Sequence, residues 1–328
     1  MALRLEQVDG ASFAPEASSL LKEAWANQPS MEYSPEYVAW QLSFPSPIPP
    51  VAVAAFDGAE PVGFVAATVR RLRLDSNETD GFAASFWCMR PGRGGPLGPL
   101  LLLENLVKKL RSFDTPVLVF GLHDGRGERL FPPIYARAGF LATGLGSLPT
   151  YAFLVRPDQT ASDWIVTESD STAVLSELVS QCASKDPTLL YLSPDRAQLD
   201  HYSRDPRARR LLVATDTKTG SRAAAWAIRA SFRNAGGVVS SAPTLDSVIL
   251  ERSRADALPA LLRAAAEPGS TATAHSVVVN APSLAGFNAE ALQSFGVRQV
   301  SSGFQGHLYL PPSRTDWQSA KGTASEII

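Results

Sequence analysis

Two arginines and four glycines occur within nine residues, Arg90 to Gly98, between an apolar stretch and a leucine-rich one. We expect the preceding residues, Phe82 to Met89, to form a strand, and those that follow, up to Lys109, to form a helix. A glycine-rich turn that leads into a helix lets backbone N–H groups approach a ligand, and the helix dipole adds roughly half a positive charge there. The loop is therefore predicted to bind a phosphate or a pyrophosphate.

The spacing of the glycines excludes two common phosphate-binding loops. No Gly-Lys-Ser/Thr sequence ends the loop, as a P-loop for nucleoside triphosphates requires. The Gly-x-Gly-x-x-Gly pattern of dinucleotide-binding folds is also missing, although Gly95 and Gly98 preserve its second half. What remains is Arg93-x-x-Pro96-x-Gly98, preceded by Pro91.

This remaining pattern resembles the pyrophosphate loop of the GCN5-related N-acetyltransferase (GNAT) superfamily, Arg/Gln-x-x-Gly-x-Gly/Ala. Pro96 replaces the first glycine of that pattern, which removes one N–H donor. A second match follows a buried-looking strand, Pro116 to Leu122, because Tyr135 to Phe140 is similar to the Tyr-x-x-x-Gly-Phe signature of the superfamily. Both motifs, in order and separated by a strand, predict a unit that binds acyl-CoA.

The resemblance implies an α/β (α+β) protein whose mixed, mostly antiparallel twisted sheet is flanked by helices. It also implies an N-acetyltransferase that uses acetyl-CoA, or another acyl-CoA, as cosubstrate and needs no metal. The acyl group would pass to an amine of a small molecule or peptide by direct attack in a ternary complex. The cosubstrate-binding residues that it implies lie at the end of the strand and in the loop: Trp87, Cys88, Met89, Arg93, Gly94, Gly95, Pro96, Leu97 and Gly98.

The same resemblance suggests the groups that move protons. Tyr135 stands where family members have the general acid for the leaving thiolate, and the alternative is a tyrosine that only packs. Family members often have a glutamate on the motif strand as general base, but Phe82 to Met89 contains no acidic residue. We expect His123 to be the base, with Glu32, Asp80 or a water chain as alternatives.

Aromatic residues gather near the N-terminus, where the superfamily binds its acceptor. Tyr33, Tyr37 and Trp40 are the acceptor-binding residues that we expect, and they favour an apolar or ring-containing amine. The alternative is that they belong to the core side of a helix.

A weak internal repeat relates the two halves of the chain. Ser34-Pro35-Glu36 recurs as Ser193-Pro194-Asp195, and the hairpin Val51 to Arg70 recurs as Leu211 to Phe232. The repeat predicts two tandem GNAT-like domains, residues 1–157 and 163–312, joined by a polar linker. A polar tail, residues 313–328, is expected to pack loosely.

The second copy lacks the features of the first. Opposite Arg93 to Gly98 stand Arg252 to Ala257, which contain no glycine, and Leu292 stands opposite Tyr135. We therefore expect the second domain to be a degenerate copy that does not bind coenzyme A and serves as support or as a cleft wall.

Composition limits the remaining possibilities. With 328 residues the chain suits two domains, and a net charge of −2 gives no reason to expect a nucleic-acid or membrane partner. The basic run Arg204 to Arg210 is expected to be a solvated loop. Two cysteines make no disulfide framework, the four histidines lack metal-ligand spacing, and no signal or membrane span is evident, so a cytoplasmic protein, monomer or homodimer, is expected.

Two other interpretations stay open. The chain could be a non-catalytic tandem GNAT-like protein that holds a metabolite or an acyl-CoA as a binding or regulatory module. It could also be an acyltransferase that takes a longer acyl-CoA.

Overall fold

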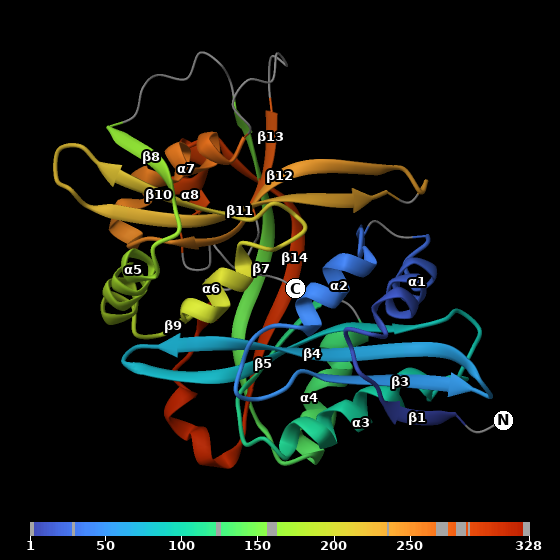
Figure 1. Ribbon diagram of the computed structural model, residues 1–328. Helices are drawn as coiled ribbons and strands as arrows, with labels where there is room; N and C mark the ends of the chain where they lie inside the picture. Colours follow the sequence, from blue (N-terminus) through green and yellow to red (C-terminus); the bar gives the residue numbers. More distant parts are fainter. Residues whose placement is uncertain are drawn as a thin grey trace.

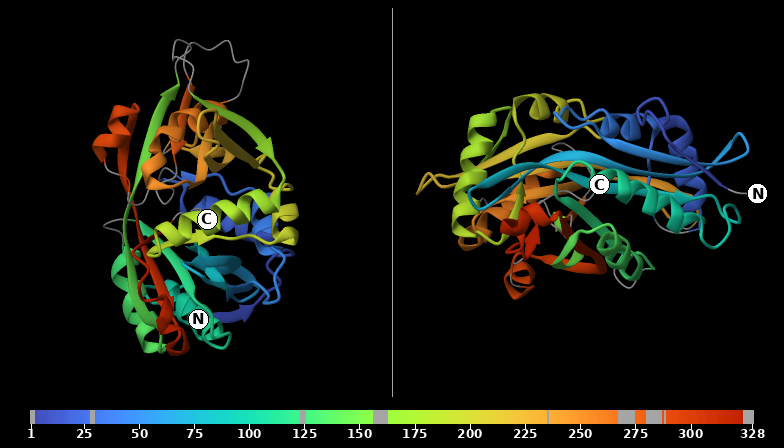
Figure 2. Two further views of the ribbon diagram at one scale, coloured as in Figure 1. Left: turned by 90° about the vertical axis from the view of Figure 1, so that its left-hand side faces the viewer. Right: turned by 90° about the horizontal axis from the view of Figure 1, so that it is seen from below.

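The computed structural model describes residues 3–27, 30–122, 126–155, 163–234, 236–266, 275–279, 287 and 289–323. Its strands form one continuous, mostly antiparallel sheet whose main path is β1-β3-β4-β5-β6-β14-β7-β13-β12-β11-β10-β8. The view from below shows helices on both faces of this twisted sheet (Figures 1 and 2). The predicted α/β class, with a mixed, mostly antiparallel twisted sheet flanked by helices, is thereby confirmed.

Each half contributes strands and helices in a similar order. The N-terminal half comprises β1 (Arg4–Gln7), α1 (Ala14–Ala24), β2 (Ser30–Met31), α2 (Pro35–Leu42), β3 (Val51–Asp57), β4 (Glu60–Leu74), β5 (Asn77–Met89), α3 (Gly98–Arg111), β6 (Val117–Leu122), α4 (Arg126–Arg137) and β7 (Leu141–Val155). The C-terminal half comprises β8 (Trp164–Ser169), α5 (Thr172–Lys185), β9 (Leu189–Leu192), α6 (Arg196–Tyr202), β10 (Arg210–Asp216), β11 (Arg222–Arg233), β12 (Val239–Ile249), η1 (Arg252–Ala257), α7 (Leu258–Ala265), β13 (His275–Val279), α8 (Ala289–Ser294), β14 (Val297–Leu310), η3 (Pro312–Trp317) and β15 (Gly322–Thr323).

The two copies of the Ser-Pro-Glu/Asp segment begin equivalent helices. The Ser34 hydroxyl accepts a hydrogen bond from the Tyr37 N–H at the start of α2, and the Asp195 carboxylate accepts one from the Gln198 N–H at the start of α6. A side chain that caps an otherwise unpaired helix N–H fixes where the helix begins. The capping residues therefore explain why the repeat is legible in the sequence at these positions.

The halves exchange their last strands. The end of β14 lies between β6 and β7, so that Tyr309 stands opposite Val117 on one side and Ala142 on the other. In turn the end of β7 pairs with β13 of the second half, where Phe153 stands opposite Val277. Figure 1 shows β7 and β14 side by side, running from the lower half of the molecule into the upper one. Each half of the sheet is therefore completed by a strand of the other.

A shared core joins the halves on the side of α1, α2, α5 and α6. The Trp40 indole lies flat on the His201 ring, with centroids 5.0 Å apart. Its Nε1–H donates to the His201 carbonyl at 3.0 Å, and His201 Nε2 lies 2.9 Å from the Trp40 carbonyl. A carbonyl oxygen only accepts, so this His201 nitrogen carries the proton. Burial lowers the pKa of His201, which suits a neutral ring in this interface.

The C-terminal segment is packed, in contrast to the loose tail expected from its polar sequence. Trp317 of η3 has none of its surface exposed and lies in a cluster with Leu308 and Leu310 of β14. Thr323 pairs with β9 as part of β15. One large aromatic side chain thus anchors a segment whose average composition is polar.

Candidate functional site

Strands β5 and β6 separate where the predicted site begins. They pair in parallel only from Phe82 to Ala84, opposite Val117 to Val119. Beyond these residues a register shift between β4 and β5 places a bulge at Phe86, whose φ of +58° is in the left-handed region. A bulge bends its strand and ends regular pairing. The facing edges of β5 and β6 are therefore free to pair with a ligand from Ser85 onward.

The glycine-rich loop leads from the end of β5 into α3. Gly92, Gly94 and Gly95 have φ values of +74°, +74° and +64°. A side chain at Gly95 would meet no atom within 4 Å, so its outer surface is open. Within the described part of the chain, no hydrogen bond engages the N–H groups of Gly94, Gly95 and Leu97. The loop thus presents unpaired amides at the start of a helix, as an anion site requires.

Carboxylates on neighbouring elements neutralise the loop's arginines. Arg93, predicted to pair with a phosphate, lies 3.4 Å from Asp57 and 3.4 Å from Glu60 at the β3–β4 turn. Arg90 pairs with Glu60 and with Glu23 of α1. Arg93 is 48% exposed, and pairs of this kind hold their partners weakly in water. Arg93 would have to exchange carboxylate for phosphate in order to act as predicted.

The three predicted residues at the end of β5 point to different faces of the sheet. Trp87 and Met89 pack in the cluster under α3, and the Trp87 Nε1–H donates to the Pro99 carbonyl at 3.1 Å. Cys88 packs in the cluster under α1 and α2, and burial raises the pKa of its thiol to about 12. Cys88 is therefore a buried thiol that stays protonated at neutral pH.

Tyr135 of α4 is completely buried beside the sheet. Its ring lies parallel to that of Tyr309, with centroids 3.9 Å apart and planes at 7°, and Phe140 contacts it edge-on at 5.5 Å. Its hydroxyl has no hydrogen-bond partner among the described residues, and burial raises its pKa. The other predicted proton carrier, His123, lies outside the described residues.

Two other buried polar atoms that lack a hydrogen-bond partner among the described residues belong to β5 and to α3. Ser85 Oγ, at the point where β5 leaves β6, and Asn105 Oδ1, in the middle of α3, are buried without a partner in the described structure. A buried polar group that lacks a hydrogen bond costs about 1–3 kcal/mol. A pantetheine chain carries amide and carbonyl groups that suit such atoms. The free strand edges, the open loop and these orphaned atoms together fit an acyl-CoA.

The acceptor residues predicted from the sequence lie together, close to the bulge. Tyr33 and Tyr37 contact the Phe86 ring at 5.7 and 6.4 Å. Tyr37 and Trp40 are 2% and 6% exposed, whereas Tyr33 is only partly buried. Tyr33 is thus the most accessible of the three, and Trp40 joins the two halves.

The second half supplies charged residues to this aromatic cluster. The Arg207 guanidinium lies 4.1 Å from the Tyr37 ring centre, and that of Arg209 lies 4.7 Å from the Tyr202 ring centre. Both pair with Asp205, at 2.8 and 2.9 Å. The expectation of a solvated loop was wrong for these residues, whose side chains are 9% and 0% exposed. Asp205 is a near neighbour in the sequence, but Tyr37, on which Arg207 lies, belongs to the other half, so local composition carried no signal of burial.

The alternative bases lie in different settings. Glu32 forms ion pairs with Lys22 at 3.3 Å and with Arg233 of β11 at 2.7 Å, which connect the acceptor side to the second half. Asp80 lies near the other end of β5 from the bulge, and partial burial raises its pKa.

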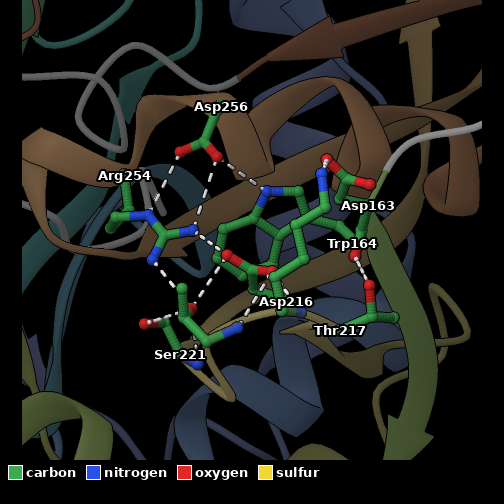
Figure 3. A network of polar contacts seen from close by, with 9 residues as sticks. Asp163, Trp164, Asp216, Thr217, Ser221, Arg254 and Asp256 are labelled. Atoms are coloured by element: carbon green, nitrogen blue, oxygen red, sulfur yellow. Dashed lines mark hydrogen bonds and ion pairs between the residues drawn. The ribbon is translucent and has the colours of Figure 1, made fainter.

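The corresponding loop in the second half is filled by side chains (Figure 3). Arg254 of η1 pairs with Asp216 and Asp256, and its guanidinium lies 4.7 Å from the Trp164 ring centre. The Trp164 Nε1–H donates to Asp256 at 2.9 Å. Hydrogen bonds from Arg254, first of all, hold the pKa of Asp216 below its usual range. The atoms that fill this loop leave no open cradle of amides.

Membrane-spanning helices and metal-binding clusters are both missing among the described residues. No helix among them is long and apolar enough to cross a membrane. No group of three or more histidine, cysteine, aspartate or glutamate side chains there is arranged to hold a metal ion.

Comparison of the structure with solved structures identifies its fold. It matches Saccharomyces cerevisiae N-myristoyltransferase with bound myristoyl-CoA at a TM-score of 0.64 and 12% identity, over 100% of this chain and 86% of that one. It also matches a GCN5-related N-acetyltransferase from Anabaena variabilis (TM-score 0.56, 12% identity, 93% of this chain and 72% of that one). A third match is a GCN5-related N-acetyltransferase from Kribbella flavida (TM-score 0.52, 12% identity, 94% and 71%).

The sequence itself gives no such match. No family model matches the chain, and no curated protein matches it. The solved structures therefore establish that the chain has the GNAT fold predicted from its two motifs, in a form that superposes over its whole length on N-myristoyltransferase. At 12% identity they establish the fold alone.

Proposed function

We propose that the protein is an acyl-CoA-dependent N-acyltransferase whose donor site lies in the first half, with acetyl-CoA as its cosubstrate and an amine as its acceptor. The observation that carries this proposal is the coincidence of an open glycine cradle with a separated pair of strands. The N–H groups of Gly94, Gly95 and Leu97, unpaired in the described structure, lie at the start of α3, and β5, the strand that leads into this loop, leaves β6 after Ala84. Pyrophosphate and pantetheine need these two features side by side.

The residues that would hold the cosubstrate follow from this arrangement. The loop amides would bind the pyrophosphate, and the free edge of β5 would pair with the pantetheine amides. The pantetheine amides would provide a hydrogen-bond partner for Ser85 Oγ and Asn105 Oδ1, which have none in the described structure. When bound, the thioester supplies an activated acyl carbon.

Tyr135 is the proton donor in this proposal. As the amine nitrogen bonds to the acyl carbon, the carbon–sulfur bond breaks and its electron pair stays on sulfur. Tyr135 gives the sulfur a proton and recovers one from water, and the proton lost by nitrogen passes to water or to His123. Burial raises the pKa of Tyr135 and keeps the phenol protonated. A thiolate leaving group in the same apolar surroundings would also be disfavoured by burial, which would favour proton transfer to sulfur.

The acceptor would enter on the side of α1 and α2. Tyr33, Tyr37 and Phe86 offer ring faces to an apolar or aromatic amine, and Glu32 fixes this region to the second half. A longer acyl-CoA is the second candidate donor. It is favoured by the similarity to N-myristoyltransferase with bound myristoyl-CoA, which extends over the whole chain.

Thermal shift with acetyl-CoA, myristoyl-CoA and coenzyme A tests the donor. A ligand at one hundred times its dissociation constant should stabilise the protein by about 2.7 kcal/mol, which is readily measured. The donor that gives the larger shift at equal concentration decides between the two candidates. A melting temperature unaffected by all three at millimolar concentration would contradict the proposal.

Tyr135→Phe separates catalysis from binding. We expect coenzyme A to bind this variant as it binds the wild type, while turnover falls about 100-fold, within the range for loss of a general acid. Undiminished turnover would rule out the acid role. Normal binding with no turnover in either protein, across a panel of aromatic and aliphatic amines, would support the non-catalytic alternative.

A further inference from the structure

We propose that the second half takes part in the reaction through Tyr309, a positioning residue that sets the ring plane of Tyr135. This inference rests on the proposed function, because it assigns a task to the ring that contacts the proton donor. Tyr309 belongs to β14, the strand that the second half inserts between β6 and β7 of the first. Its side chain therefore reaches α4 of the first half only because the strands are exchanged.

The Tyr135 side chain is held through its ring and not through its hydroxyl group. A proton donor is usually oriented by a hydrogen bond to its polar atom, but the Tyr135 hydroxyl has none within the described structure. Two ring contacts remain: the parallel face of Tyr309 at 3.9 Å and the edge of Phe140 at 5.5 Å. The direction of the Tyr135 O–H group is thus fixed by packing of the ring and not by a polar partner.

The parallel stacking of Tyr309 on Tyr135 requires a flat ring at position 309. The planes of Tyr135 and Tyr309 differ by only 7°. A flat neighbour holds the plane of the Tyr135 ring, and a branched aliphatic side chain of similar size restrains that plane less. Rotation of the ring about its own axis leaves the hydroxyl oxygen in place, but the phenolic O–H bond prefers the plane of the ring, so a fixed plane limits the directions in which the proton points. His307, two residues earlier on β14, also stacks on Tyr309, with ring centroids 5.9 Å apart and planes at 22°. The three rings form a ladder that crosses from one half to the other.

The hydroxyl group of Tyr309 takes no part in holding Tyr135. It too is buried without a hydrogen-bond partner among the described residues, and burial raises its pKa. The hydroxyl therefore adds nothing to the fit of the ring, and the aromatic face is the part of Tyr309 that matters. A phenylalanine at this position should perform equally well.

The experiment is a double-mutant cycle on turnover of the acyl-CoA donor that gives the larger thermal shift. In the wild-type background Tyr309→Leu should lower kcat about tenfold, the scale expected from small misplacement of a reacting group, with an unchanged dissociation constant for that donor. Tyr309→Phe should keep kcat within about twofold. In the Tyr135→Phe background Tyr309→Leu should change kcat by less than about twofold, because no proton donor is left to position.

Trp317→Leu is the matched control. Trp317 is an equally buried aromatic residue that packs beneath the opposite face of β14, with Leu308 and Leu310. It should lower the melting temperature and leave kcat unchanged at temperatures where the protein is folded. If Tyr309→Leu fails to fold, Tyr309→Met, with a flexible chain of similar length, takes its place in the cycle.

Two results would overturn the inference: a kcat unaffected by Tyr309→Leu, or an equal loss of kcat in both backgrounds, which would mean a purely structural role. Failure of the proposed function would give different results in the same experiments. In that case Tyr135→Phe itself leaves turnover unchanged, or no acyl-CoA binds any variant.

Discussion

The molecule contains the same strand-to-helix loop twice, and only one copy is open. In the first half, Arg90 to Leu97 presents glycines with positive φ and three amides that make no hydrogen bond in the described structure. In the second half, η1 occupies the equivalent place, and Arg254 extends across it to Asp216 and Trp164 (Figure 3). The difference shows that one position of the fold is open in the first half and crossed by an arginine side chain in the second.

An ion pair between loop and hairpin occurs in both halves, but at different places in the loop. Arg93, at the start of the first loop, pairs with Asp57 of the β3–β4 turn and is 48% exposed. Arg254, in the middle of the second loop, pairs with Asp216 at the end of β10, and these side chains are 21% and 8% exposed. By the repeat, Arg254 stands where the first loop has Gly95. The second half therefore carries an arginine at a position where the first loop has only a glycine, in addition to Arg252 opposite Arg93.

The largest expected effect comes from closing the first loop. Gly95→Asn adds a side chain to the surface where nothing lies within 4 Å, at a φ of +64° that asparagine tolerates. The free protein should therefore stay folded, while acetyl-CoA loses access to two or three amides. With about 1.5–3 kcal/mol for each charge-assisted hydrogen bond, we expect a dissociation constant at least about 100-fold higher.

The matched control is Gly220→Asn in the second half. Gly220 has a φ of +72° and, like Gly95, no atom within 4 Å of an added Cβ. Calorimetric titration should give the wild-type affinity for this variant. Equal loss of affinity in both variants, or in neither, would contradict the placement of the pyrophosphate site in the first loop.

A smaller effect should follow from restoring the missing amide of the first loop. Pro96→Gly adds an N–H donor at the position where the superfamily pattern has glycine. The gain of about 1.5–3 kcal/mol from a bond to phosphate is offset by about 0.4–1 kcal/mol of added chain flexibility. We expect acetyl-CoA to bind about tenfold more tightly. Weaker binding would mean that Pro96 holds the loop in its bound conformation.

The smallest effect concerns the stability of the second loop and its dependence on pH. Because its pKa in the folded state is depressed, Asp216 stabilises the fold above its unfolded pKa of about 3.9 and loses this effect as pH falls below it. Asp216→Asn should therefore lower the melting temperature slightly at pH 7, and the difference from wild type should begin to shrink below about pH 4, so that it is smaller at pH 3 than at pH 7. Affinity for acetyl-CoA should stay the same.

Asp163→Asn serves as its control, since the Asp163 pair with Lys218 is 60% and 70% exposed. We expect almost no change in melting temperature from this variant. A melting difference for Asp216→Asn that persists unchanged to pH 3 would contradict the assigned pKa direction.

The sequence revealed the parts of this account that depend on local patterns. Glycine spacing located the open loop, and capping residues with alternating hydrophobicity revealed both copies of the fold. The separation of β5 from β6 has no local signal in the sequence, since the bulge at Phe86 has no glycine to mark it. Whether Tyr135 and the acceptor residues act as predicted stays open to the experiments above.

The pairing of strands that are distant in the chain could not be predicted from the sequence. Nothing in β7 or β14 indicates that they change partners, because an exchanged strand keeps the same hydrophobic alternation as one that stays. For the same reason the stack of Tyr135 on Tyr309 and the burial of Arg207 and Trp317 could not be foreseen. Each of these depends on residues more than 100 positions away in the chain or on a single contact in a polar segment.

Isothermal titration calorimetry of the wild-type protein with acetyl-CoA tests the central claim most directly, because it counts sites. One open loop and one filled loop predict a single binding site for each chain. Two equivalent sites per chain, or no binding up to millimolar acetyl-CoA, would contradict the account.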